Sequence, residues 1–89
     1  MSKRFALLYS DDVSRTLDNL LKNNADAFQR IVAALRTFAG NPYAPGAPRV
    51  NEDGLAELRQ PGLFRAACHV AGTPERGGVV TTVRLLALA

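Results

Sequence analysis

Two arginines and a histidine lie close together in the sequence and could bind or act on an anionic group. Two short apolar-rich runs, 55–59 and 63–70, each contain an arginine, Arg59 and Arg65, and His69 follows in the second run. A guanidinium group stays charged at neutral pH and presents several N–H donors to phosphate or carboxylate oxygens. An imidazole titrates near neutral pH and can act as a general acid or base. The residue types therefore indicate anion binding, with acid–base chemistry as a further option.

These side chains are expected to share one face of a sheet, because side chains alternate across a strand. In the first run, Glu57 and Arg59 fall on the same face. In the second run, Arg65 and His69 do the same. The opposite faces of both runs are apolar and consist of Ala56, Leu58, Phe64, Ala66, Cys68 and Val70. The apolar faces predict the core.

A third arginine, Arg84, is expected on the same side of the sheet. Strict alternation along 79–88 groups Thr82 with Arg84. The residues that alternate with this pair are Val79, Thr81, Val83 and Leu85. One side of the sheet is thus expected to stay open and to collect Arg59, Arg65 and Arg84. Three guanidinium groups on one face repel one another unless an anion lies between them, which favours a phosphate backbone or a carboxylate-rich segment as partner.

A structural alternative remains for each of these residues. Glu57 would pair with one arginine across the strands, and the other arginines would be solvated. His69 would be a polar surface residue on an exposed strand. Tyr43, in the proline-rich segment before the sheet, is interpreted as an aromatic lid on the edge of the core rather than as a ligand contact.

A first amphipathic helix is expected after a short strand, Phe5–Tyr9. The strand runs into Ser10-Asp11-Asp12, whose side chains accept hydrogen bonds from the free N–H groups of a helix start. The apolar stripe that follows at helical spacing consists of Val13, Leu17, Leu20 and Leu21. Asn23-Asn24 closes this helix.

A second, stronger helical pattern begins at Ala25 or Asp26. Its apolar stripe consists of Phe28, Ile31, Val32, Leu35 and Phe38. Gly40, just after the stripe, predicts a left-handed residue at the helix end. Helices joined by two or three residues pack as a hairpin, and both stripes need a sheet to cover them.

The second half of the chain predicts that sheet. Residues 41–54 contain three prolines and two glycines, which exclude helix and central strand and indicate a crossing loop. Pro-Gly and Gly-Gly turn signals then make neighbouring strands antiparallel. The predicted strands are Leu55–Arg59, Leu63–Val70 and Val79–Leu88. With the first strand at the edge of this meander, residues 1–89 are expected to form one α+β domain of β-α-α-β-β-β order, with the helical hairpin on one face.

Composition supports a small globular domain. The 89 residues are 47% hydrophobic and 21% charged, far from the composition of disordered chains. The net charge of +3 is mild and fits either an anionic partner or a solvated basic surface. The apolar run Phe5–Leu8 is too short for a signal peptide or a membrane span, which predicts a cytoplasmic protein without membrane contact.

Several kinds of site are not expected. The single cysteine, Cys68, excludes an internal disulfide and is interpreted as a small buried hydrophobe. No Cys/His cluster has metal-ligand spacing, and there is no phosphate-cradling glycine loop, so neither a metal nor a cofactor is predicted. The open face lacks the aromatic side chains on which single-stranded bases stack.

Four motifs follow the expected order of elements: Asp11-Asp12 before the hairpin, Asn41-Pro42 after it, the segment 49–59, and Phe64-Arg65 at the next strand. Together with that order, they resemble the RelE/ParE superfamily of toxins from bacterial type II toxin–antitoxin systems. The family shows a glycine and an apolar residue before a Glu-Leu-Arg or similar triplet, followed by an aromatic-Arg pair. The similarity runs along nearly the whole chain.

This resemblance implies a small toxin that a cognate antitoxin protein wraps and neutralises. RelE-like and HigB-like members are endoribonucleases that cut mRNA on the ribosome without a metal, whereas ParE-like members inhibit DNA gyrase. Ribosome-dependent mRNA cleavage is the first hypothesis and gyrase inhibition the second. A catalytically degenerate protein-binding module of the same fold is the third.

The resemblance also implies roles for individual residues. The arginine of the aromatic-Arg pair takes part in the nuclease reaction, which assigns Arg65 to catalysis. Positive charge there would stabilise the scissile phosphate as the ribose 2′-hydroxyl attacks it. Arg59 would position the phosphate and His69 would serve as base. The arginines expected to bind the substrate are Arg84, Arg49 and Arg76.

The chain departs from the nuclease pattern at its last residues. Nuclease members continue past the last strand into a basic stretch with a Tyr, His or Lys that completes the site, whereas Leu85–Ala89 are all apolar. Either the activity rests on the arginines and His69 alone, or the target is not mRNA, or the chain is shortened. A gyrase inhibitor, which needs a binding surface more than acid–base groups, fits this departure.

Overall fold

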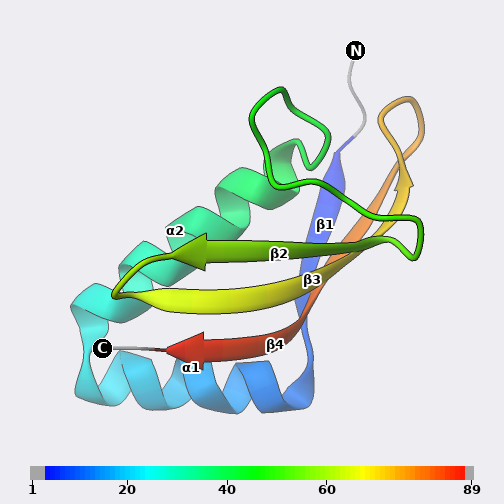
Figure 1. The fold of residues 1–89 in the computed structure, drawn as a ribbon. Helices are drawn as coiled ribbons and strands as arrows, with labels where there is room; N and C mark the ends of the chain where they lie inside the picture. Colours follow the sequence, from blue (N-terminus) through cyan, green and yellow to red (C-terminus); the bar gives the residue numbers. More distant parts are fainter. Residues whose placement is uncertain (1–3, 88–89) are drawn as a thin grey trace.

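A four-stranded sheet with two helices on one face makes up the fold (Figure 1). A computed structural model describes residues 4–87. The elements in chain order are β1 (Phe5–Tyr9), α1 (Asp11–Asn23), α2 (Ala25–Gly40), β2 (Leu55–Gln60), β3 (Phe64–Thr73) and β4 (Gly77–Ala87). The predicted β-α-α-β-β-β order is confirmed.

The strand order within the sheet is β1-β4-β3-β2. β2, β3 and β4 form the predicted antiparallel meander, and β1 joins its edge parallel to β4. In Figure 1, α2 lies along the far face of β2 and β3, and α1 runs below β4. One face of the sheet is therefore covered by helices and the other is uncovered.

The core lies between the helices and the covered face. Both apolar stripes contribute to it, although Leu21 is 52% exposed and lies outside it. The buried helical residues are Val13, Leu17, Ala27, Ile31, Val32, Leu35, Phe38 and Ala39. They pack on the apolar sides of the strands, which consist of Ala56, Leu58, Phe64, Ala66, Cys68, Val70 and Val80. The predicted core faces of β2 and β3 are all buried.

A single residue, Asn24, joins the two helices. Its backbone N–H bonds to the Leu20 carbonyl and ends α1, while its side chain accepts a hydrogen bond from the Ala27 N–H at 3.2 Å and begins α2. The prediction of a left-handed Gly40 is wrong. Gly40 is the last residue of α2, and Asn41 ends the helix outside the helical region, with φ −156°. Pro42 explains this, since the residue before a proline is pushed out of the helical region.

The alternation predicted for β4 is also wrong, because the strand contains a β-bulge. Thr82 pairs with Cys68 but Arg84 pairs with Ala67, so Val83 is an extra residue on β4. Thr82 is fully buried, and its hydroxyl lies 3.7 Å from the Cys68 sulfur. Thr82 and Arg84 therefore point to opposite faces rather than to the same one.

The crossing loop between α2 and β2 returns along the edge of the core. Tyr43 packs its ring 6.2 Å from that of Phe5 and donates a hydrogen bond to the Gly72 carbonyl at 3.2 Å. Its position agrees with the predicted lid. Within residues 4–87, neither helix is long and apolar enough to cross a membrane.

Candidate functional site

The uncovered face of the sheet brings three arginines together on adjacent strands. Arg59 on β2 and Arg65 on β3 are directly opposite in the strand register. Arg84 on β4 is opposite Ala67, two residues along β3 from Arg65. Adjacent strands lie about 4.8 Å apart, and residues two apart on a strand lie about 7 Å apart. All three side chains are exposed. The strand register therefore gathers the three guanidinium groups on the open side, as expected.

One carboxylate lies among these arginines. Glu57 accepts a hydrogen bond from Arg65, with 3.0 Å between Oε1 and the guanidinium nitrogen, and both side chains are more than half exposed. An exposed pair of this kind contributes at most about 1 kcal/mol to stability. Within residues 4–87, Arg59 and Arg84 make no ion pair or side-chain hydrogen bond. We call Glu57, Arg59, Arg65 and Arg84 the cationic cluster.

A cavity of about 310 Å³ opens within the cationic cluster. It is lined by Glu57, Arg65, Ala66, Ala67, Arg84 and Leu86. The alanines leave room for a ligand to approach the strands, while the charged groups converge from three strands. A cavity of this size is at the lower end of the range for small-ligand sites, and its charges suit a phosphate or a carboxylate.

His69 lies on the predicted face but away from the cationic cluster. It is four residues along β3 from Arg65, which corresponds to about 13 Å in an extended strand. Its register partners are Leu55 and Thr81. The imidazole lies against Gly54, where an added Cβ would be 3.0 Å from Nε2. The spacing of four residues in the sequence already implies this distance. His69 does not line the cavity.

Arg49 and Arg76 also lie outside the cavity. Arg76 is in the turn between β3 and β4, where its backbone N–H bonds to Thr73 at 3.2 Å. At the rise of an extended strand, this turn is about 26 Å from Arg65. Arg49 is exposed in the crossing loop. The structure thus brings Arg59, Arg65 and Arg84 together, whereas His69, Arg76 and Arg49 do not line the cavity.

Sequence reasoning treated Glu57 only as a counter-ion and missed two features of the uncovered face. The first is that Glu57 lines the same cavity as Arg65 and Arg84. The second is exposed apolar surface on the same face: Leu86, which lines the cavity, is 53% exposed, and Leu8 on β1, in register with Thr81, is equally exposed. The uncovered face therefore combines cationic and apolar groups.

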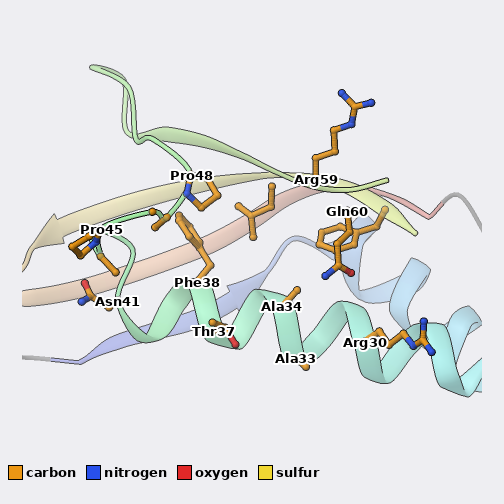
Figure 2. Close-up of a pocket in the computed structure, with 15 residues that line it drawn as sticks. Arg30, Ala33, Ala34, Thr37, Phe38, Asn41, Pro45, Pro48, Arg59 and Gln60 are labelled. Carbon is orange, nitrogen blue, oxygen red and sulfur yellow. The ribbon is translucent and has the colours of Figure 1, made fainter. Parts of the chain in front are cut away.

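A second cavity of about 790 Å³ lies between α2, the loop segment 44–48 and the edge strand β2 (Figure 2). Its apolar side chains include Phe38, Leu58 and Phe64, and small residues of α2 leave it open. Arg30 and Arg59 are at its rim, and Figure 2 shows Arg59 pointing away from it. The residues that line it include no carboxylate. We call this cavity the α2–β2 groove.

The shifted pKa values belong to groups on the covered side. Burial raises the pKa of the Cys68 thiol, and its contact with Thr82 opposes this only in part. Burial likewise raises the pKa of Tyr9, against the effect of the Arg36 charge. A buried, protonated thiol is a poor nucleophile, so Cys68 acts as a packing residue. Among residues 4–87, no three His, Cys, Asp or Glu side chains lie close enough together to hold a metal ion.

Comparison with known proteins finds similarity at the level of the fold. No family profile and no curated protein sequence matches the chain. Among solved structures, a YoeB/ParE toxin from Agrobacterium tumefaciens is similar, with a TM-score of 0.70 at 15% identity over 93% of this chain and 98% of that one. The toxin–antitoxin complex RelBE2 from Mycobacterium tuberculosis gives 0.53 at 21% identity, over 98% and 97%.

Proposed function

Because the chain has the fold of RelE/ParE-like toxins, we propose that it is the toxin of a type II toxin–antitoxin pair. We propose further that it is an endoribonuclease that cleaves mRNA on the ribosome without a metal. The observation that carries this proposal is the cationic cluster, in which Arg65, Arg84 and Glu57 line one cavity on the uncovered face. RNA is a polyanion, and such a cluster binds its phosphates.

The proposed reaction needs charge stabilisation and one proton acceptor. Arg65 and Arg84 would bind the non-bridging oxygens of the scissile phosphate, and Arg59 would position the adjacent phosphate. The ribose 2′-oxygen attacks phosphorus, the bond to the 5′-oxygen breaks, and a 2′,3′-cyclic phosphate and a 5′-hydroxyl result. The guanidinium groups stabilise the charge that develops on the phosphate oxygens.

Glu57 is the proton acceptor nearest to this phosphate site. Its carboxylate lies 3.0 Å from the Arg65 guanidinium, within reach of a 2′-hydroxyl bound beside it. Water would supply the proton for the leaving 5′-oxygen. His69, about 13 Å along the strand, would contact a flanking nucleotide or act as base for a differently placed phosphate. Arg49 and Arg76 would bind more distant parts of the substrate.

Gyrase inhibition is the second candidate, and a specific observation favours it. Leu86 is more than half exposed and lines the cationic cavity, and Leu8 exposes a further apolar side chain on the same face. Protein–protein interfaces have an apolar centre, and arginine is enriched in them although other charged residues are depleted. A binding face of this composition suits a protein target such as gyrase.

A cognate antitoxin is the proposed partner in either case. The α2–β2 groove has an apolar floor, two arginines at its rim and no carboxylate in its lining. An antitoxin segment with an apolar side chain for the floor and acidic residues for the rim would complement it. The groove and the cationic cluster share Arg59, so a segment in the groove could reach the cluster.

The deciding experiment follows induction of the chain in bacteria without an antitoxin. A nuclease stops incorporation of labelled amino acids within minutes and leaves cut transcripts whose ends can be mapped. A gyrase inhibitor induces the DNA-damage response while incorporation initially continues. Normal growth at confirmed expression of the folded protein would rule out both and leave a catalytically degenerate binding module.

A further inference from the structure

The β-bulge in β4 decides where Arg84 points. Before the bulge, Val80 and Thr82 face the core and are fully buried. If alternation continued from Thr82, Arg84 would point into the same core, where an unpaired guanidinium is very unfavourable. The extra residue Val83 shifts the phase of the strand, so that Leu85 faces inward, opposite Ala66, and Arg84 faces outward, opposite Ala67. The cationic cluster is complete only because of this irregularity.

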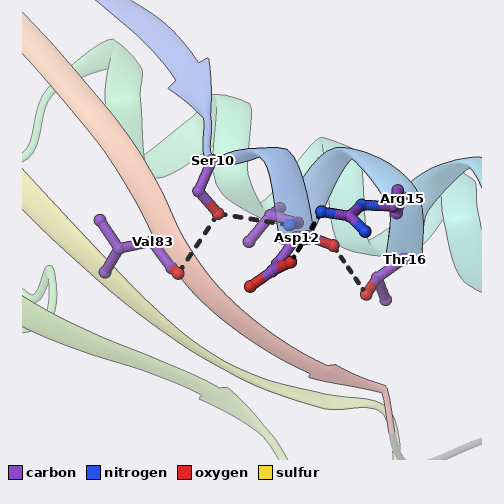
Figure 3. Close-up of polar contacts among 6 residues, drawn as sticks. Ser10, Asp12, Arg15, Thr16 and Val83 are labelled. Carbon is purple, nitrogen blue, oxygen red and sulfur yellow. Dashed lines mark hydrogen bonds and ion pairs between the residues drawn. The ribbon is translucent and has the colours of Figure 1, made fainter.

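Ser10 binds the bulge through its backbone and its side chain. β1 ends at Tyr9, and the next residue donates its backbone N–H to the Thr82 carbonyl at 3.0 Å. The Ser10 hydroxyl donates a hydrogen bond to the Val83 carbonyl at 3.3 Å and accepts one from the Val13 N–H at 3.3 Å. Figure 3 shows this hydroxyl between the start of α1 and the bulged strand.

The hydrogen bond from Ser10 gives the Val83 carbonyl a donor where the bulge interrupts the regular strand pairing. An extra residue in a bulge loses its regular ladder partner, and β1 no longer runs beside β4 beyond Thr82. The Ser10 hydroxyl donates to the Val83 carbonyl at this position. We propose that Ser10 is a positioning residue, which holds the bulge at Val83 and thereby aims Arg84 into the anion site. The effect on RNA rests on the proposed function, whereas the effect on the strand does not.

A set of substitutions separates this role from helix capping. Ser10→Thr keeps a hydroxyl that can donate and accept. Ser10→Asp keeps an acceptor for the helix N-terminus, where aspartate is as good a cap as serine, but a carboxylate cannot donate to the Val83 carbonyl. Ser10→Ala removes both bonds. The proposal predicts that Ser10→Asp and Ser10→Ala share the site defect, while only Ser10→Ala loses the cap.

The direction of position 84 can be measured without any substrate. Arg84→Cys places a thiol there, and Cys68 stays buried and does not react. A thiol is not forced outward by charge, so its reaction rate with a maleimide reports the bulge itself. The introduced thiol should react several-fold more slowly with Ser10→Asp than with Ser10 or Ser10→Thr. Equal rates across the series, in folded variants with unchanged circular dichroism, would overturn the proposal.

The link to the site is measured with a single-stranded RNA oligonucleotide as probe. Loss of one phosphate contact lowers the slope of log affinity against log salt by about 0.7. Arg84→Ala should show this decrease, Ser10→Asp should show the same decrease, and the double variant should show no more than either alone. An additive double variant would contradict a role through Arg84. If the parent chain shows no salt-dependent RNA binding, the proposed nuclease function fails, while thiol labelling still decides the role of Ser10.

Discussion

Phe64 and Arg65 are adjacent in β3 but belong to different faces of the sheet. Phe64 is 1% exposed and packs in the core, whereas Arg65 lies in solvent beside Glu57. The covered face consists of residues whose contribution is packing, and the uncovered face has few residues whose loss would unfold the chain. The difference means that stability and activity should respond to different substitutions, even at neighbouring positions.

The largest effect is expected from the covered face. Phe64→Ala should lower the free energy of unfolding by about 3–5 kcal/mol, because it leaves a cavity beneath the helices. Urea denaturation followed by circular dichroism measures the loss, which should abolish toxicity through unfolding. A loss below about 1 kcal/mol would show that the core relaxes around position 64.

The next largest effect is expected at Arg65, the neighbouring residue on the uncovered face. Arg65→Ala should reduce RNA cleavage about 10²–10³-fold, equivalent to about 2.7–4 kcal/mol of transition-state stabilisation. Stability should change by no more than about 1 kcal/mol, since the pair with Glu57 is exposed. Toxicity on induction and cleavage of ribosome-bound mRNA provide the measurements.

Arg15→Ala is the matched control for that variant, because Arg15 is also an exposed arginine with one carboxylate partner, on α1. It should leave toxicity unchanged. If both variants lost activity equally, net charge rather than the position of Arg65 would be responsible.

A smaller effect is expected at the α2–β2 groove, which borders both faces. Ala33→Arg should weaken antitoxin binding about 10- to 100-fold, or about 1.4–2.8 kcal/mol, because a bulky cation would occupy the groove beside Arg30. Toxicity without antitoxin should persist. Isothermal titration with the antitoxin measures the change, and Asn19→Arg, exposed on α1, is the control. Equal binding by Ala33→Arg and the parent chain would place the antitoxin elsewhere.

The smallest effect concerns how the free energy of unfolding depends on pH through Cys68, a residue of the covered face. The folded state raises the pKa of Cys68 above its ordinary value of 9.0. The folded chain therefore holds this proton more tightly than the unfolded chain. The resulting contribution to stability is complete below about pH 9 and is lost as the pH rises through the pKa of the folded state. Stability should fall by at most about 1.4 kcal/mol per pH unit in that window. Urea midpoints at pH 8 and pH 10 measure this, and a chain with Cys68→Ala should show a flatter profile.

Local patterns predicted the two faces of β2 and β3 well. Alternation in 63–70 assigned Phe64 to the core and Arg65 to the surface, and helical spacing identified most of the buried stripe. These predictions succeed because each strand or helix carries its own periodicity. The distance between Arg65 and His69 was also present in the sequence, since four residues of strand span about 13 Å.

The bulge could not be predicted from alternation within β4. It depends on Ser10, which is 73 residues away in sequence from its hydrogen-bond partner Val83. The end of α2 depends on residues that are close in sequence. Pro42, rather than Gly40, determines how this helix ends. Arg84 was predicted on the correct face, but Thr82, its predicted neighbour on that face, lies on the opposite one, because the bulge follows Thr82 and shifts the alternation by one residue.

The parallel pairing of β1 with β4 has a consequence for how the protein is made. Ribosomes add about 5–20 residues per second, so the 73-residue separation between Ser10 and Val83 corresponds to roughly 4–15 s. During that interval the first strand has been synthesised but β4 is absent or incomplete. The bulge, and with it the complete anion site, can form only when β4 has emerged, so a partly translated chain lacks the assembled cluster.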